Sequence, residues 1–127
     1  MKILTLSIKQ KFFDEIISGK KKNEYREVRP STFDKYLRYI YNGKEYKNSE
    51  LPDDVDVDIQ PIKYDAIKFL TGEYKGTRPF ITVAVKKAEL QILTDDNDED
   101  IIYEENGIEY VAAQMNYTLG EIIDKNV

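Results

Sequence analysis

Lysine, glutamate and arginine gather in one short stretch near the start of the chain, Gly19-Lys20-Lys21-Lys22-Asn23-Glu24-Tyr25-Arg26. Crowding of ammonium groups favours a neutral, nucleophilic amine, which is one route to a reactive lysine. A nearby carboxylate such as Glu24 acts in the opposite direction, because it pairs with a cation and keeps the cation charged. The stretch is therefore consistent with a catalytic pair of Lys21 and Glu24, and equally with a salt bridge beside a binding surface. A solvated rim of lysines is the third interpretation.

The chain has no cysteine and no histidine. Their absence removes disulfides, thiolate catalysis, zinc–cysteine sites, Ser-His-Asp catalysis and imidazole metal ligands. Any chemistry must use Lys, Glu, Asp, Tyr or Thr, and we expect no metal and no cofactor. An EF-hand loop that began at Asp96 would need glycine and glutamate where the chain has Ile101 and Gly107. We interpret residues 95–105 as a solvated acidic loop.

Charge is unevenly distributed along the 127 residues. The net charge of −5 argues against general affinity for nucleic acid. Residues 1–50 nevertheless hold 12 Lys/Arg and 7 Asp/Glu, a balance of +5, whereas residues 51–127 hold 7 and 17, a balance of −10. This asymmetry predicts a local positive face on an acidic body.

The length and the 41% of hydrophobic residues fit one folded domain that spans residues 1–127. No apolar run approaches the roughly 20 residues that a membrane-spanning helix needs. The first residues are too short and too charged for the core of a signal peptide. We therefore expect a cytoplasmic location and no membrane partner.

A helix is predicted over residues 8–18, directly before the charged stretch. Ser7 and Gln10 form a capping box, and Gly19 suits the left-handed residue that ends a helix. Apolar residues recur with helical spacing and predict one buried stripe, formed by Ile8, Phe12, Phe13, Ile16 and Ile17. On the strand expected at 21–28, residues 22, 24 and 26 share a face, so Lys21 joins them only if the turn after Gly19 rotates it. The strand pattern alone leaves open whether Lys21 or Lys22 faces the site.

The rest of the chain predicts mostly strands. A second helix is expected from Ser31 as N-cap to a stop at Asn42-Gly43, and a long connection over 44–62 with a short edge strand near Val55–Ile59. Further strands and a closing element are expected at 64–71, 79–93, 109–117 and 119–123. The pattern predicts an α+β fold with mostly antiparallel strands.

Tyrosines alternate with cations after residue 35, where Tyr36, Tyr39, Tyr41 and Tyr46 interleave with Arg38, Lys44 and Lys47. Such aromatics can stack on single-stranded bases while the cations hold phosphates. The alternative is that these rings simply pack a helix onto a sheet. Arg78 is expected either to reach the same site or to serve as an ordinary turn cation.

The motif Gly19-x-Lys21-x-x-Glu24-x-Arg26, at the junction of the first helix and a strand, resembles the opening of the ASCH family within the PUA-like superfamily. The segments 24–30, 72–80 and 119–122 are similar to a small bacterial and phage subgroup. The resemblance implies a mostly antiparallel β-barrel with two to three short helices and a cleft beside the motif. Family members are proposed to bind RNA, and some are enzymes.

The resemblance favours a binding module for RNA or a nucleotide, with a ligand site at Lys21, Lys22, Glu24, Arg26, Tyr39 and Arg78. The alternative is a small amidohydrolase or ribonuclease that acts on a modified nucleoside or RNA, with Lys21 and Glu24 as the catalytic pair. In the amidohydrolase branch, which hydrolyses acetylcytidine nucleosides, the motif lysine is catalytic and threonine occupies the place of Glu24. Because this chain has glutamate there, we expect weak RNA binding and no turnover of acetylcytidine.

Overall fold

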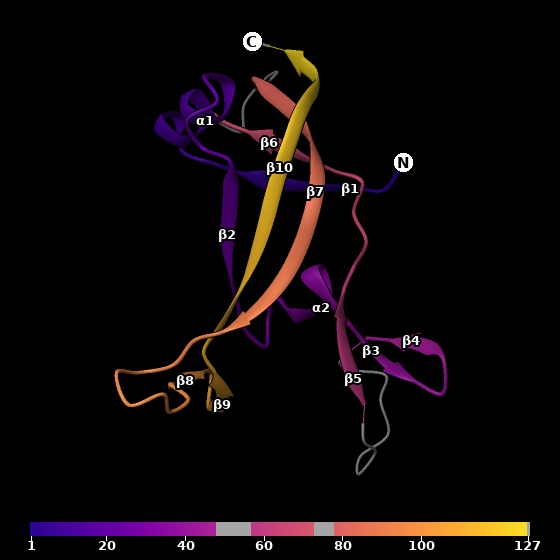
Figure 1. Ribbon diagram of the computed structural model, residues 1–127, viewed down its shortest axis with the longest axis vertical. Helices are drawn as coiled ribbons and strands as arrows, with labels where there is room; N and C mark the ends of the chain where they lie inside the picture. Colours follow the sequence, from indigo (N-terminus) through magenta and orange to yellow (C-terminus); the bar gives the residue numbers. More distant parts are fainter. Residues whose placement is uncertain (48–56, 73–77, 127) are drawn as a thin grey trace. The chain divides into compact units, whose positions relative to one another are not determined.

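The computed structural model describes residues 1–47, 57–72 and 78–126 (Figure 1). The chain divides into two compact units, each built from segments that are distant in sequence. Unit 1 consists of Met1–Glu24, Lys63–Ala88 and Tyr117–Val127, and unit 2 consists of Tyr25–Ile62 and Glu89–Asn116. The single domain predicted over residues 1–127 stays a prediction.

Unit 1 contains β1 (Ile3–Ser7), α1 (Gln10–Ile17) and β6 (Ala66–Leu70). Unit 2 contains α2 (Phe33–Tyr36), β3 (Leu37–Tyr41), β4 (Lys44–Tyr46), β5 (Asp58–Pro61), β8 (Ile102–Glu105) and β9 (Ile108–Val111). Three longer strands contribute residues to both units: β2 (Asn23–Val28), β7 (Phe80–Ile92) and β10 (Ala113–Asn126).

The main sheet has the strand order β1-β6-β7-β10-β2. β1 pairs with β6 in parallel, and β6 pairs with β7 antiparallel, so that Ile67 lies between Leu4 and Val83. These three side chains are buried, as is Phe69. Phe13 and other apolar residues of α1 complete the core of unit 1, because they supply the apolar face that a short amphipathic helix must bury. The strands predicted at 64–71 and 79–93 correspond to β6 and β7.

The first helix occurs where the sequence predicts it, but its beginning differs. The predicted capping box is wrong: Ser7 ends β1, the N-cap Lys9 makes no side-chain capping bond, and the Gln10 amide donates to Asp14 at 2.9 Å. The predicted end is confirmed, because Gly19 has φ +81°.

The apolar stripe of α1 is only half buried. Phe13 and Ile16 are buried, whereas Phe12 and Ile17 are 38% and 40% exposed, contrary to the prediction. An eight-residue helix contacts a sheet along a narrow line, so residues on the flanks of the stripe remain accessible.

The second predicted helix is wrong beyond its first turn. The helix α2 has four residues, and the chain then forms the hairpin β3–β4 through Asn42 and Gly43, whose φ angles are 50° and 75°. Two consecutive positive φ values define the type I′ turn, which matches strand twist and favours Asn-Gly. The predicted long connection at 44–62 thus contains β4 and β5. Ile59 lies in β5, at the edge of a sheet ordered β4-β3-β5, while Val55 lies outside the described residues.

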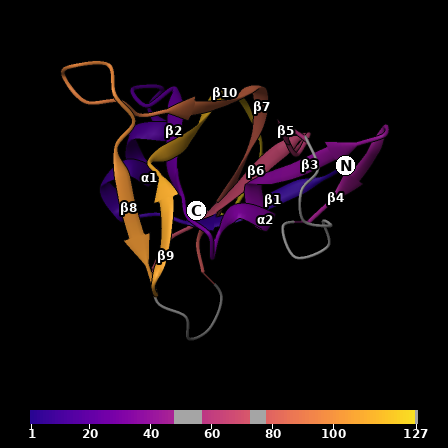
Figure 2. The same cartoon turned by 90° about the horizontal axis from the view of Figure 1, so that it is seen from below.

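A second Asn-Gly hairpin replaces part of the predicted acidic loop. Asn106 and Gly107 connect β8 to β9, two antiparallel strands that Figure 2 shows side by side. The last strand expected at 109–117 is divided between β9 and the start of β10, and the closing element expected at 119–123 lies within β10.

The fold is β-rich and of the α+β type, with two short helices among the described residues. The main sheet ends at β1 and β2, and the described part of the chain shows no closed barrel, so the barrel remains a prediction. No helix in residues 1–47, 57–72 and 78–126 is long and apolar enough to cross a membrane.

Candidate functional site

The turn after α1 places Lys21 outside the alternation of β2. Gly19 adopts the left-handed conformation and its N–H donates to the Ile16 carbonyl at 3.2 Å. The Lys21 N–H donates to the Glu15 carbonyl at 3.0 Å, and β2 begins only at Asn23. Because Lys21 belongs to the turn rather than to the strand, its side chain is free to point to the same side as Glu24.

Lys21 and Glu24 form a partly buried ion pair. The Lys21 Nζ lies 3.5 Å from Glu24 Oε1, with the side chains 18% and 7% exposed. The same ammonium lies 5.4 Å from the centroid of the Phe12 ring, within the range of a cation–π contact. A buried carboxylate is costly without a partner, so the position of Lys21 explains how Glu24 is accommodated. The salt bridge expected from the sequence is present.

A cleft of about 250 Å³ lies beside this pair in unit 1. Among the residues that the structure describes, three lysines and no acidic residue line it, together with apolar residues. The lining residues are Lys21, Lys22, Lys86, Ile16, Val83, Leu119, Ile122, Gly19 and Gly120. Lys22 and Lys86 are exposed, whereas Lys21 is less accessible. We refer to this site as the basic cleft.

The pairing of strands brings Lys22 and Lys86 to the same cleft. The Leu119 N–H donates to the Lys22 carbonyl at 2.8 Å, and β10 neighbours β7, which carries Lys86. A Cβ at Gly120 would lie only 3.3 Å from the Lys86 Cγ and 3.4 Å from the Ala84 carbonyl oxygen. Gly120 therefore leaves room for the aliphatic stem of Lys86, and the Lys86 ammonium reaches solvent.

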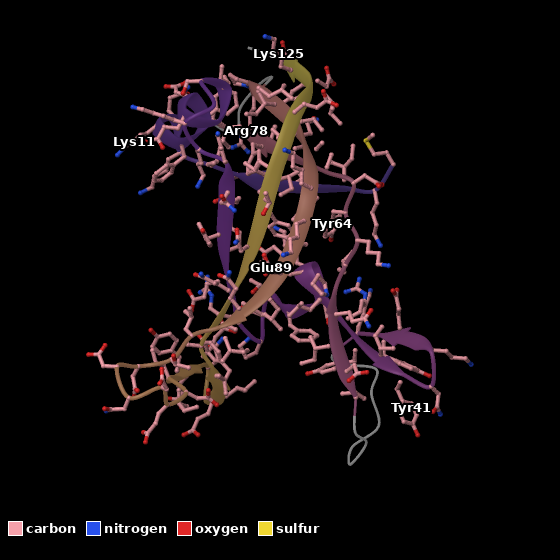
Figure 3. All side chains as sticks on the ribbon, viewed as in Figure 1. Lys11, Tyr41, Tyr64, Arg78, Glu89 and Lys125 are labelled. Carbon is pink, nitrogen blue, oxygen red and sulfur yellow. The ribbon has the colours of Figure 1, made fainter. Side chains whose placement is uncertain are left out.

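Arg78, a predicted ligand residue, contacts backbone at the end of β6 (Figure 3). Its guanidinium donates to the carbonyls of Thr71 and Leu70 at 3.3 and 3.4 Å and to Ser7 Oγ at 3.4 Å. The residues that line the basic cleft do not include Arg78. These contacts favour the alternative of a structural cation that holds the end of the strand.

Tyr39 and Arg26 belong to unit 2, whereas the residues that line the basic cleft belong to unit 1. Tyr39 stacks on Phe33, with ring centroids 4.7 Å apart and an interplanar angle of 24°. Partial burial, and then the negative charge of Asp34, raise the pKa of the Tyr39 phenol above its ordinary value. Arg26 is half buried on β2, two residues beyond Glu24. Their proposed roles as ligand residues remain predictions.

Lys86 and Gly120 were not predicted as site residues. Lys86 lies in the middle of the strand predicted at 79–93, where a lysine signals only an exposed position. Its place in the cleft depends on the pairing of β7 with β10, which joins residues more than 30 positions apart in a way that local pattern does not specify.

The comparisons with known proteins return no match: no family model, no curated protein and no solved structure matches this chain. The resemblance to the ASCH family therefore stays a prediction. Inference about function begins from the geometry of the basic cleft.

Proposed function

We propose that this protein is a cytoplasmic binding module for RNA or a nucleotide, related to the ASCH family and its PUA-like barrels. In this proposal the basic cleft holds a phosphate group. The supporting observation is that Lys21, Lys22 and Lys86 line one cleft together with apolar residues and, in the part of the chain that the structure describes, without an acidic side chain. Ammonium groups bind phosphate oxygens as point charges, and an apolar lining tolerates a sugar or a base edge.

The charge of unit 1 supports an anionic ligand. Its segments hold 13 Lys/Arg and 7 Asp/Glu, a net charge of +6, although the whole chain has a net charge of −5. A positive region of this size raises the local concentration of anions and steers their approach. The ligand reaches the cleft through that local field rather than through the net charge of the protein.

The size of the cleft favours one phosphate at a time. Its volume of about 250 Å³ is below the roughly 300–1,000 Å³ of pockets that enclose drug-sized molecules. A single-stranded RNA that passes over the cleft satisfies this limit, because only one phosphate and its neighbouring sugar need to enter. We therefore favour a single strand over an enclosed mononucleotide.

Binding of short RNA at several salt concentrations tests the proposal. One phosphate in the basic cleft and one or two neighbouring phosphates at its exposed lysines make two to three contacts in this proposal. They predict a slope of log K against log salt of about −1.4 to −2.1, because each contact on a single strand contributes about −0.7. Lys86→Glu should weaken binding and make the slope shallower by about 0.7. Fluorescence anisotropy with a labelled oligouridine measures both quantities.

Lys87→Glu is the matched control for Lys86→Glu. The two lysines are consecutive and exposed in β7, so the same charge reversal occurs on the opposite face of the strand. Lys87→Glu should retain most of the affinity. Equal losses in the two variants, or no binding by the unaltered protein at low salt, would contradict a site in the basic cleft.

The second candidate function is hydrolysis, and the Lys21–Glu24 pair is the observation that favours it. A carboxylate 3.5 Å from an amine has the geometry of an acid–base pair. In this contact Lys21 is the cation of an ion pair and of a cation–π contact, and an ammonium cation is a poor nucleophile. We therefore expect no turnover of acetylcytidine or short RNA. Turnover that Lys21→Ala abolishes while RNA binding persists would replace the binding proposal by hydrolysis.

A further inference from the structure

A cleft of about 540 Å³ lies in unit 2, on the hairpin β8–β9 and the adjoining strands. Two tyrosines and two glutamates line it, Tyr103, Tyr110, Glu27 and Glu104, and Leu93 and the buried Ala112 contribute apolar surface. No lysine or arginine of the described ranges 1–47, 57–72 and 78–126 lines this cleft. We refer to it as the acidic–aromatic cleft.

The tyrosines present two ring surfaces at an angle. Tyr103 and Tyr110 lie directly opposite each other across β8 and β9, with ring centroids 6.0 Å apart and an interplanar angle of 66°. In this edge-to-face arrangement the edge of one ring meets the face of the other. The remaining ring faces carry the partial negative charge of the π system, which attracts cations.

The Glu27 carboxylate places a full negative charge beside the Tyr110 ring. The Tyr110 hydroxyl donates to Glu27 Oε1 at 3.1 Å, so the carboxylate is held beside the ring. Glu27 Oε2 also lies 3.8 Å from Arg29 Nε, an exposed contact that screens the charge only partly. Residues 89–116 contain nine Asp/Glu and no Lys/Arg, so the neutralising cations of this segment must come from elsewhere.

The hairpin also opposes two like charges. Glu104 lies directly opposite Glu109 in the β8–β9 register. Like charges at directly opposed positions destabilise an antiparallel pair. These two side chains lie on the face of the hairpin opposite Tyr103 and Tyr110, because successive residues of a strand alternate. A cation near the hairpin lowers their electrostatic repulsion, and an anion near the hairpin raises it. The hairpin thus has an electrostatic preference for one sign of ligand.

We infer that the acidic–aromatic cleft binds an organic ammonium cation. The ammonium or its methyl groups contact the faces of Tyr103 and Tyr110, Glu27 balances the charge, and the alkyl part covers Leu93 and Ala112. The volume exceeds what an inorganic ion needs. Calcium requires six to eight oxygen ligands, which two aromatic rings and an apolar surface do not supply.

Choline and its uncharged isostere 3,3-dimethylbutan-1-ol test the charge requirement on the unaltered protein. The two probes have nearly the same shape and differ in the positive charge. We expect choline to bind at least about tenfold more tightly, in line with the strength of a partly desolvated cation–π contact. Calorimetry measures both affinities. Equal binding of the two probes, or binding of neither at millimolar concentration, would overturn the inference.

Variants then locate the site. Tyr103→Leu keeps apolar bulk but removes a π face, and should weaken choline binding about fivefold, whereas Tyr103→Phe should retain it. Glu27→Gln should also weaken binding more than Glu109→Gln, which removes the same charge at a position outside the lining. If Tyr103→Leu fails to fold, the comparison of these two glutamate variants still decides. Identical affinities for Glu27→Gln and the unaltered protein would place choline elsewhere.

The ammonium can come from a free amine or from a lysine side chain. n-Butylamine and a short capped peptide with a single lysine carry the same head group. Tighter binding of the peptide would assign the site to a protein side chain, and equal binding would assign it to small amines. Failure of both to compete with choline would contradict the inferred ammonium site.

Discussion

The basic cleft and the acidic–aromatic cleft differ in almost every property that selects a ligand. The first has about 250 Å³, is lined by three lysines and belongs to a unit with a net charge of +6. The second has about 540 Å³, is lined by two glutamates and two tyrosines, and belongs to a unit with 6 Lys/Arg and 17 Asp/Glu, a net charge of −11. One chain thus provides surfaces of opposite sign.

This difference shows why the net charge of −5 is a poor guide to partners. Potential at a surface depends on the charges within about one Debye length, roughly 8–10 Å at ordinary ionic strength. Each unit combines segments that are distant in the sequence, so the sorting of charge follows the fold rather than the order of residues. We expect the two clefts to respond in opposite ways to ligands of each sign.

The largest expected effect concerns the helix that positions the basic cleft. Phe13 is 2% exposed, so Phe13→Ala should lower the free energy of unfolding by about 3–5 kcal/mol through loss of burial and a residual cavity. The adjacent Phe12→Ala, at an exposed ring, should cost less than about 1 kcal/mol. Urea denaturation gives both values. Equal costs for the two neighbours would contradict the observed orientation of α1.

Removing one ion pair from each unit should have a smaller effect on folding stability, and the effect should differ between the two pairs. Lys21→Met removes the cation beside the buried Glu24 and should cost about 1–3 kcal/mol of folding stability. Arg29→Met removes a contact of 3.8 Å with Glu105 in unit 2, where the arginine side chain is 47% exposed, and should cost about 0–1 kcal/mol. Denaturation in urea at low and high salt measures each change. A larger cost for Arg29→Met would reverse our ranking of the two pairs.

The smallest expected effect is a shift in the ionisation of Tyr110. Partial burial, the hydrogen bond to Glu27 and the nearby carboxylates raise the pKa of the Tyr110 phenol above its ordinary value of 10.0. Because the folded pKa is raised, the related stability is complete below the unfolded pKa and is lost as pH rises through the folded pKa. Glu27→Gln should lower the pKa of Tyr110 towards its ordinary value. Phenolate absorbance during an alkaline titration follows this change, and subtracting the titration of the matching Tyr110→Phe variant isolates Tyr110 from the other nine tyrosines.

An unchanged phenol titration in Glu27→Gln would show that the carboxylate does not influence Tyr110. That result would also withdraw the Glu27 carboxylate as support for cation binding in the acidic–aromatic cleft. The basic cleft would be unaffected by that result, so the two assignments can fail separately.

Local signals predicted the elements on which unit 1 depends. The helical spacing of apolar residues and Gly19 located α1, and the alternation around Ile81 and Val83 located β7. The capping box at Ser7 failed because that residue is already paired in β1. The second helix failed because Asn42-Gly43 is a hairpin signal of type I′, and its two positive φ values fit a reversal of strands better than a helix end.

The candidate site was predictable only in part. The Lys21–Glu24 pair follows from a spacing of three residues and the turn at Gly19, both of which are local. Lys86 and Gly120 enter the basic cleft through strand pairing over long distances, which a single sequence does not encode in any local pattern. The Tyr103–Tyr110 pair was also missed, because the residues of β8 were assigned to the acidic loop at 95–105.

Chemical-shift mapping with labelled protein tests the central claim, that the basic cleft binds single-stranded RNA, most directly. A short oligouridine is titrated into one sample and choline into another, and backbone amide shifts are followed in both. We predict that RNA shifts the amides of residues 19–22, 83–86 and 119–122, while choline shifts residues 103–104 and 110–112. Shifts from RNA that are confined to residues 95–111, or the absence of any shift at 19–22 and 86, would contradict RNA binding at the basic cleft.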